Sequence, residues 1–207
     1  MTTKFTTLDE AKQKRITDAA MREFAEHSYD QASTNRIVQE AGIGKGMLFH
    51  YFGSKEALYA YLAERAITVL EELYTQYIDM DEPDFIERMK GSAQLKMEVY
   101  QRYPDLFNFI AQAVLEKESK LPKPLADRLD HMQQDGMRRL FSGLDMTLFR
   151  DDVQAEDVLK LISWSIDGYS KELHAKLNGA TFTEIDQEPH WQQFYEFLDV
   201  LKRVYYK

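Results

Sequence analysis

The stretch that decides the fold is residues 33–52, STNRIVQEAGIGKGMLFHYF. The hydroxyl side chains of Ser33 and Thr34 suit the start of a helix, where they accept hydrogen bonds from free backbone N–H groups. Gly42 stands where this first helix should end, because glycine readily adopts the left-handed backbone of a helix C-terminus. Gly44 then opens a second short helix. This pattern predicts a helix-turn-helix, whose second helix enters the DNA major groove.

The second helix, residues 45–52, should present one face to solvent and the other to a small core. We expect Leu48, Phe49 and Phe52 to hold it down. The residues expected to face outward are Lys45, Gly46, Met47, His50 and Tyr51. A helix with small, basic and polar groups on its outer face is what duplex recognition requires.

Each outward residue has an expected role at double-stranded DNA. Lys45, together with Lys55 at the start of the next helix, should pair with phosphates. Gly46 has no side chain, so the backbone can come close to the duplex. Met47 and His50 are candidates for base edges or thymine methyl groups. The expected sugar-phosphate, helix N-terminal or flanking contacts are Tyr51, Ser33, Thr34, Asn35, Arg36 and Gly44.

The stretch resembles the DNA-binding motif of the TetR family of bacterial regulators. The resemblance rests on Ile37, Ala41-Gly42-Ile43, Gly46, Phe49-His50-Tyr51-Phe52, Lys55 and Leu58. It runs from Tyr29 to Leu58, and the helix before it fits as well, whereas the rest of the chain agrees in length and helical layout only. Two positions depart from the family pattern. Gly44 stands where Ser or Thr is usual and Phe49 where Tyr is frequent, so two hydroxyl contacts to phosphate are missing.

Composition bounds the remaining possibilities. The chain has 207 residues, 44% of them apolar, which allows one large or two small domains with a sizeable core. It has no cysteine, so it has neither a disulfide framework nor thiolate chemistry. The first ten residues lack the apolar run of a signal peptide, and no stretch approaches a membrane span, so we expect a cytoplasmic protein.

The net charge of −9 is unevenly distributed. Residues 1–55 contain 8 lysine and arginine residues against 7 aspartate and glutamate residues, so the acidic excess lies in residues 56–207. An acidic remainder should weaken non-specific DNA binding through long-range repulsion. Affinity for DNA must therefore depend on where the cations of the N-terminal part lie.

Periodicity along the chain predicts an all-α fold. A capping box at Thr7–Glu10 should begin the first helix, which runs to about His27. Its expected core, shared with the two short helices, is Ile16, Ala20, Phe24, Ile37, Ala41, Leu48 and Phe52. Further helices are expected from Lys55 to the Asp79–Glu82 stretch, from Pro83, from Pro104, after the 121–124 break, after the 142–152 loop as far as Asn178-Gly179, and from Pro189 to Tyr206. The predicted domains are a helix-turn-helix DNA-binding module at 1–54 and a larger helical ligand-binding and dimerisation domain at 55–207.

The resemblance implies a homodimer that binds a palindromic operator. The last two helices, rich in aromatic and aliphatic residues, should pair with their copies in a second subunit. The expected interface residues are Leu159, Ile162, Ile166, Tyr169, Trp191, Phe194, Tyr195 and Leu198. A two-fold dimer is also what a helix-turn-helix of this sort needs to read two half-sites.

Methionine and aromatic residues are frequent between residues 59 and 141. Packing explains any one of them, but together with the resemblance they indicate a cavity for a small hydrophobic or aromatic ligand. The expected pocket residues are Leu62, Ala66, Met89, Ala93, Met97, Tyr100, Phe107, Ile110, Met132, Phe141, Trp164 and Asp167. We expect no cofactor and no metal, because His131 and Asp135 share a helix face without a third ligand nearby in sequence.

The sequence therefore favours a ligand-responsive transcriptional regulator, expected to be a repressor and not an enzyme. One alternative is a DNA-binding regulator with a solid core, controlled by a protein partner. A second is a helical-bundle enzyme, which would need convergent acid, base or metal groups that the spacing does not present. A third, a membrane-surface protein, is opposed by the acidic charge of residues 56–207.

Overall fold

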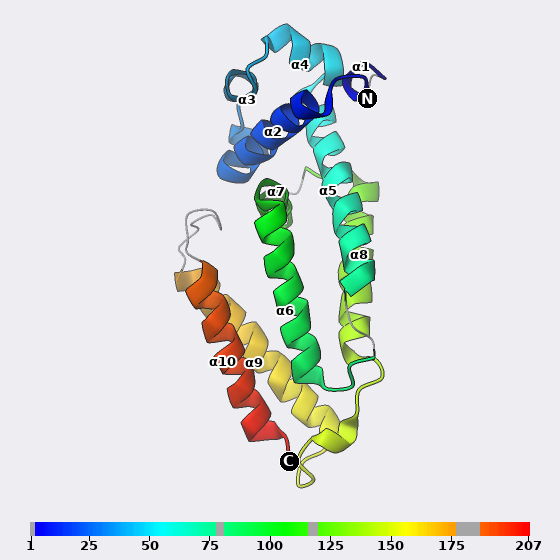
Figure 1. Cartoon of the computed structure of the whole chain (residues 1–207), viewed down its shortest axis with the longest axis vertical. Coiled ribbons are helices and arrows are strands. Elements are labelled where there is room, and N and C mark those ends of the chain that lie inside the picture. Colours follow the sequence, from blue (N-terminus) through cyan, green and yellow to red (C-terminus); the bar gives the residue numbers. More distant parts are fainter. Residues whose placement is uncertain (1–2, 78–80, 116–119, 177–186) are drawn as a thin grey trace. The chain divides into compact units, whose positions relative to one another are not determined.

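The computed structural model describes residues 3–77, 81–115, 120–176 and 187–207, and within these ranges the chain is all-α, as expected. The helices drawn in Figure 1 are α1 Thr3–Thr6, α2 Glu10–Gln31, α3 Thr34–Ala41, α4 Lys45–Phe52, α5 Lys55–Tyr77, α6 Phe85–Arg102, α7 Pro104–Leu115, α8 Lys123–Phe141, the 3-10 turn η1 Met146–Leu148, α9 Ala155–Lys176 and α10 Gln187–Tyr205. The only β-type pairing in these ranges is an isolated antiparallel bridge between Phe149 and Tyr206.

Several helix starts agree with the sequence expectations. α5 begins at Lys55, and the Ser54 hydroxyl accepts a hydrogen bond from the Ala57 N–H at 3.1 Å. α7 begins at Pro104, where the missing N–H of proline costs nothing. The stop expected for α9 at residues 178–179 lies outside the described residues.

The first long helix has a different cap from the one expected. The Asp9 carboxylate accepts from the Lys12 N–H at 2.9 Å, so the predicted capping box starting at Thr7 is wrong. The reason is α1, which ends at Thr6 and leaves Thr7 in the turn before the helix. α2 also continues past His27 to Gln31, across a break at Ser28, where φ is 56°.

The start of α6 was also expected elsewhere. The helix begins at Phe85, two residues after Pro83, because Asp84 caps it. The Asp84 carboxylate accepts from the backbone N–H groups of Ile86 at 2.8 Å and Glu87 at 3.2 Å. Two charge-assisted bonds at a helix N-terminus outweigh the weak preference of proline for the first position.

Packing divides the chain into two compact units. The first unit joins Met1–Gln76 with Glu98–Gln134, and the second joins Tyr77–Met97 with Asp135–Lys207. The first thus contains the predicted DNA-binding module together with α5, the end of α6, α7 and the first part of α8. The functional boundary at residue 54 is a different division and stays a prediction.

The N-terminal module, residues 3–52, has the small core that its sequence predicts. All seven expected core residues are buried, and Phe5 of α1 joins them. α7 packs against α2 in the same unit. Aromatic rings of α2, α5 and α7 contact one another there. The Phe24 ring lies 5.0 Å from that of Tyr59 and 6.2 Å from that of Phe109, which ties α2 to α5 and α7.

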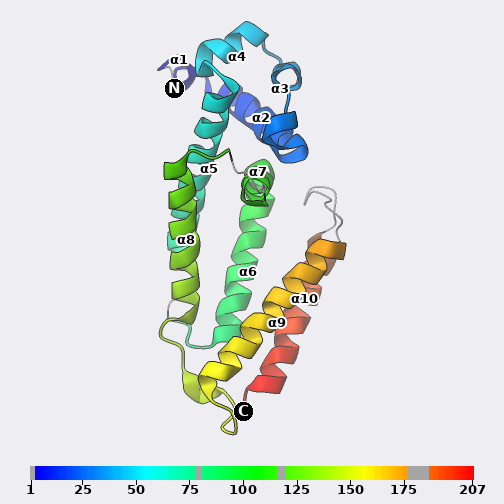
Figure 2. The ribbon, with the colours of Figure 1, turned by 180° about the vertical axis from the view of Figure 1, so that it is seen from behind.

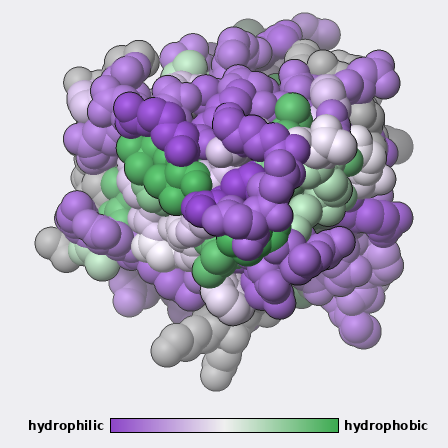
Figure 3. Space-filling view, turned by 90° about the horizontal axis from the view of Figure 1, so that it is seen from below, coloured by the Kyte–Doolittle hydropathy of each residue, from purple (hydrophilic) through white to green (hydrophobic). Residues whose placement is uncertain are grey.

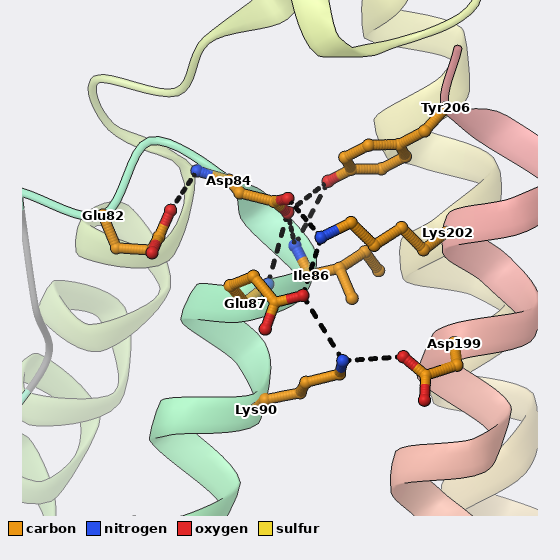
Figure 4. Close-up of polar contacts among 8 residues, drawn as sticks. All are labelled: Glu82, Asp84, Ile86, Glu87, Lys90, Asp199, Lys202 and Tyr206. Carbon is orange, nitrogen blue, oxygen red and sulfur yellow. Dashed lines mark hydrogen bonds and ion pairs between the residues drawn. The ribbon is translucent and has the colours of Figure 1, made fainter.

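The second unit has its own core, where α9 and α10 lie side by side (Figures 1 and 2). A polar cluster joins the start of α6 to the end of α10 (Figure 4). The Tyr206 hydroxyl donates to Asp84 at 2.7 Å, and Lys202 pairs with Asp84 at 2.7 Å. Lys90 pairs with Asp199 at 2.6 Å one turn further along. Although burial raises it, these hydrogen bonds lower the pKa of Asp84 overall.

The surface seen from below is mainly hydrophilic, with hydrophobic residues gathered in separate patches (Figure 3). Scattered exposed apolar side chains are normal on folded proteins, and only larger groups of them need an explanation. The large exposed apolar side chains of the described residues are Met47, Phe49, Val114, Met137, Phe141, Met146, Leu161, Trp164, Val200 and Val204.

Candidate nucleic-acid interface

The turn between α3 and α4 has the backbone that its glycines predict. Gly42 adopts the left-handed conformation, with φ 63° and ψ 40°, and closes the end of α3. The Ile43 N–H donates to the Val38 carbonyl at 3.0 Å, which satisfies one of the last free carbonyls of that helix. Gly44 is the N-cap of α4 in an extended conformation. The two helices therefore form the predicted helix-turn-helix.

The outer face of α4 is open to solvent. Lys45, Gly46 and His50 are exposed, and Met47 is 37% exposed. Lys45 makes no hydrogen bond or ion pair with any described residue, so its charge is available to a partner. Figure 1 shows α3 and α4 together at the top of the picture, with α2 below them.

Two aromatic side chains of α4 are oriented opposite to expectation. Tyr51 is 6% exposed, whereas Phe49 is 38% exposed. The cause is Phe5 of α1, whose ring lies 5.8 Å from that of Tyr51 and 4.7 Å from that of Phe52. The prediction that Tyr51 faces outward is therefore wrong, and Phe49 joins the exposed face instead.

α3 is anchored by a buried carboxylate. Ser33 is the N-cap, but its side chain makes no capping bond, contrary to expectation. Instead its N–H donates to the Glu23 carboxylate at 2.6 Å, and Arg36 donates to both oxygens of the same carboxylate at 2.9 Å. Burial raises the pKa of Glu23, but the bonds from Arg36 and Ser33 outweigh it and lower that pKa overall.

The remaining predicted DNA contacts lie at the same end of the module. Asn35 and Arg36 are exposed, whereas Thr34 is half-buried. Lys55 is also half-buried, with its ammonium 4.8 Å from the centre of the Tyr29 ring and 3.4 Å from the Asp30 carbonyl. Arg36 and Lys55 thus have internal partners, and Lys45 is the lysine of the motif that is free of them.

The predicted pocket residues of the first unit belong to its packed core. Leu62, Ala66 and Ile110 are buried there, and Met132 packs against the same core. Separately, Tyr100 and Phe107 are both half-buried and pack ring to ring at 5.7 Å.

The predicted pocket residues on α6 and α8 in the second unit are partly accessible. Ala93 is buried, Met97 is half-buried, and Met89 packs against the core of that unit. The Phe141 ring lies 5.0 Å from that of Phe85.

The two pocket residues predicted on α9 face solvent. Trp164 is 64% exposed, and Asp167 is exposed and pairs with Lys171 at 2.6 Å. Val158 and Ile162 pack inward at helical spacing, and Trp164 lies about 200° around the helix from Ile162, so it points the other way. The prediction that Trp164 and Asp167 line a cavity is therefore corrected.

One residue that sequence reasoning missed is Lys96. It stands at helical spacing from Met89, Ala93 and Tyr100, so a lysine in an otherwise apolar stripe was the available signal. It makes no hydrogen bond or ion pair with the described residues. Its side chain reaches solvent, yet desolvation by the surrounding protein lowers its pKa. A cation held in this way is a candidate for binding an anionic group.

The predicted dimer interface is also partly corrected. Leu159, Ile162 and Leu198 are buried in the core of their own unit, because α9 and α10 first pack against each other. The other five predicted residues, Ile166, Tyr169, Trp191, Phe194 and Tyr195, are half-buried. The exposed apolar side chains of these two helices are Leu161, Trp164, Val200 and Val204.

Other site types find little support in the described residues. Among them no group of histidine, cysteine or acidic side chains is arranged to hold a metal ion. Asp135 pairs with Arg139 at 2.6 Å. In the same ranges, no helix combines the length and the apolar character needed to cross a membrane.

Comparisons with known proteins also indicate a DNA-binding transcriptional regulator. The family model described as bacterial regulatory proteins, tetR family, matches residues 16–62, from α2 into α5. The chain is 26% identical over 165 residues to the HTH-type transcriptional repressor AcnR of Corynebacterium glutamicum, which covers 77% of this chain and 80% of that protein. It is 43% identical over 53 residues to an HTH-type transcriptional repressor of Mycobacterium tuberculosis, which covers 26% of this chain and 28% of that protein.

Solved structures show the same fold. A TetR family transcriptional regulator from Chloroflexus aurantiacus aligns with a TM-score of 0.70 and 22% identity. The alignment covers 100% of this chain and 98% of that one. The likeness therefore extends beyond the matched segment to the helices that follow it.

Proposed function

We propose that this chain is a transcriptional repressor of the TetR family and that it acts as a homodimer on a palindromic operator. The observation that carries the proposal is the exposed face of α4 behind the Gly42 turn. A regulator of this kind acts where the chromosome is, which places the protein in the cytoplasm. It is a regulator rather than an enzyme, as its curated relatives are.

Residues on the exposed face of α4 provide each kind of DNA contact. Lys45, which is free of internal partners, pairs with a phosphate and contributes affinity without sequence preference. Gly46 lets the helix backbone approach the groove. Met47 and His50 read base edges or thymine methyl groups, and Phe49 adds apolar contact to sugars. Tyr51 is buried, so its role is to support the helix.

Residues at the starts of α3 and α5 add contacts to the DNA backbone. Ser33, Thr34 and Asn35 lie at the N-terminal end of α3, where free N–H groups attract a phosphate. The pairing of Arg36 with Glu23 positions this end of α3, so Arg36 acts on DNA mainly through its position. Lys55, held over Tyr29, presents its charge near the start of α5.

Dimerisation uses the outer face of α9 and α10. The two helices that the resemblance assigns to the interface expose large apolar side chains, Leu161 and Trp164 on α9 and Val200 and Val204 on α10. A two-fold dimer sets the two copies of α4 about 34 Å apart, one turn of duplex, so that they read the two halves of a palindrome.

The effector is a small hydrophobic or aromatic molecule that binds among the helices that follow the N-terminal module. The partly accessible Met89 and Met97 on α6 support an apolar wall, and Lys96 on the same face supports an acidic group on the ligand. A ligand releases the operator only if it binds the two dimer shapes unequally.

A regulator without a small-molecule effector is the second candidate. Leu62, Ala66 and Ile110, which were expected to line a pocket, are packed inside the core of the first unit. A solid core would leave control to a protein partner. Titration of candidate ligands against operator binding decides between the two, because the second candidate expects no ligand to change the DNA affinity.

Selection from a random duplex pool tests the proposed function. The purified chain should enrich a palindrome at low salt, and Lys45→Ala should weaken binding to all sequences alike. The slope of log K against log salt should become shallower by about one, because one phosphate contact is lost. A pool without an enriched site would overturn the proposal, and an altered base preference with an unchanged slope would overturn the role of Lys45.

A further inference from the structure

A cleft of about 480 Å³ lies within the first unit, between the N-terminal module and the helices that follow it. It is lined by residues of α2 and α5, by the end of α6 and by the start of α7. Its volume is within the range of small-molecule sites. The cleft is separate from the apolar faces on which the expected effector depends.

Of the charged side chains that line this cleft, some have an ion-pair partner among the described residues and others have none. Asp105 pairs with Arg22 at 2.6 Å, and Asp18 pairs with Lys14, so both carboxylates are neutralised. Arg65 and Arg102 line the same cleft and make no hydrogen bond or ion pair with any described residue.

Two further features define what the cleft would accept. Arg102 lies over the Tyr103 ring, 5.3 Å from its centre, which holds its guanidinium at the wall. Glu10 also lines the cleft, but it lies in the first turn of α2, where the helix dipole already favours a negative charge. The cleft therefore has two guanidinium groups available for an external anion, which suit carboxylate or phosphate.

The walls also include apolar side chains. Met21 of α2, Val69 of α5 and Leu106 of α7 line the cleft together with the arginines. We propose that this cleft binds a small organic anion, a carboxylate or phosphate on a short apolar group, held by Arg65 and Arg102. The apolar group lies against Met21, Val69 and Leu106.

The position of the cleft links such a ligand to the DNA-binding module. Arg22 pairs with Glu40 of α3 at 2.7 Å and with Asp105 of α7 at 2.6 Å, and Asp105 is a wall of the cleft. A ligand whose head group is held by α5 and the end of α6, and whose apolar group lies against α2 and α7, changes how firmly α3 is held. We expect it to change operator affinity by about tenfold, a typical coupling between two sites. This second claim rests on the proposed function, whereas the binding itself does not.

Direct binding to the full-length chain tests the site. Hexanoate and hexyl phosphate are the probes, hexanol is the neutral control, and the affinity is measured by calorimetric titration. Arg65→Gln and Arg102→Gln should each weaken binding of the preferred anion by about tenfold. Both arginines are exposed and unpaired, so circular dichroism of the variants should be unchanged. Arg138→Gln, an arginine of α8 outside the cleft, should leave binding unchanged.

The outcomes separate the cleft from other sites. Loss of binding in Lys96→Met but not in the two cleft variants would overturn the proposal. The anion would then bind at Lys96 on α6 and not in the cleft. Equal binding in all variants, equal binding of hexanol, or no binding of either anion in the millimolar range would also overturn it. The stronger of the two anions identifies the preferred head group.

Operator binding is measured separately, with the selected duplex and saturating probe. A probe that binds through Arg65 and Arg102 but leaves operator affinity unchanged would keep the site and overturn the coupling. Failure to select any operator would overturn the proposed function and leave the calorimetric result standing.

Discussion

At Gly46, apart from its chain neighbours and its own helix backbone, an added Cβ would meet no atom within 4 Å, so the free chain has open space there. We predict that Gly46→Leu abolishes operator binding by keeping the backbone away from the groove. The fold should be kept and stabilised by about 0.8 kcal/mol, since glycine is a poor helix former. Gel shifts and thermal unfolding measure the two effects.

Gly91→Leu is the matched control for this experiment. Gly91 is also an exposed helical glycine with no protein atom near its Cβ position, but it lies on α6. It should give the same gain in stability and leave operator binding unchanged. Tight binding by Gly46→Leu would show that the backbone of α4 does not approach DNA closely.

The Glu23 carboxylate is a second residue whose role can be isolated. Glu23→Gln should destabilise the chain by about 2 kcal/mol at pH 7, because a charged acceptor for Ser33 and Arg36 is lost. The folded pKa of Glu23 is lowered from 4.5, so its contribution is complete above pH 4.5 and is lost as the pH falls through the folded pKa.

The difference in stability between wild type and Glu23→Gln should therefore shrink as the solution becomes more acidic. Urea unfolding between pH 7 and pH 3 measures it. Glu26→Gln, on the exposed side of the same helix, should change stability by no more than about 0.5 kcal/mol. A difference that stays constant with pH would mean that Glu23 is not the titrating group.

At the scale of elements, the Tyr206 hydroxyl is one of the polar groups that join the end of the chain to the start of α6. The Tyr206 hydroxyl donates to Asp84 at 2.7 Å and accepts from the Ile86 N–H at 3.2 Å. Tyr206→Phe should therefore cost about 2 kcal/mol, the scale of a hydrogen bond to a charged group. Hydrogen exchange at Ile86 should become faster.

Tyr205→Phe makes the same chemical change at the neighbouring residue. The Tyr205 hydroxyl has no hydrogen bond to any described residue, so stability and exchange should stay close to wild type. Unchanged stability in Tyr206→Phe would show that the aromatic ring, and not the bond to Asp84, holds the helix end.

Which elements could be predicted follows from how local their causes are. Gly42, Ser54 and Pro104 act on their own helix ends, and the structure confirms what they predict. α1 was missed because four residues show no periodicity. Phe5 packs on residues more than forty positions away, and that contact decides that Tyr51 rather than Phe49 turns inward.

The candidate interfaces were predictable to a similar extent. The exposed face of α4 followed from the sequence at Lys45, Gly46, Met47 and His50, but not at Phe49 and Tyr51. On α9, however, apolar residues form an inward stripe through Ile162 and an outward one through Leu161 and Trp164. Sequence spacing alone does not show which of the two stripes is buried. The packing of α10 against α9 shows that the stripe through Ile162 belongs to the core.

For the whole molecule, we expect charge and the proposed two-fold symmetry to determine DNA affinity together. The acidic residues lie mainly outside the N-terminal module, so a single module should bind DNA weakly. Two modules held by one dimer interface gain affinity because the second contact becomes intramolecular. Operator binding should therefore depend on residues of α9 and α10 that never touch DNA.

Trp164→Glu tests this dependence. A charge on the outer face of α9 should convert the dimer to a monomer, as measured by light scattering at micromolar concentration, and should reduce operator affinity by about a hundredfold. Met137→Glu places the same charge on an exposed apolar position of α8 and should leave both properties unchanged. If Trp164→Glu stays dimeric while Met137→Glu dissociates, the interface involves α8 instead. Weak operator binding by a variant that remains dimeric would separate dimerisation from DNA affinity and contradict the two-module account.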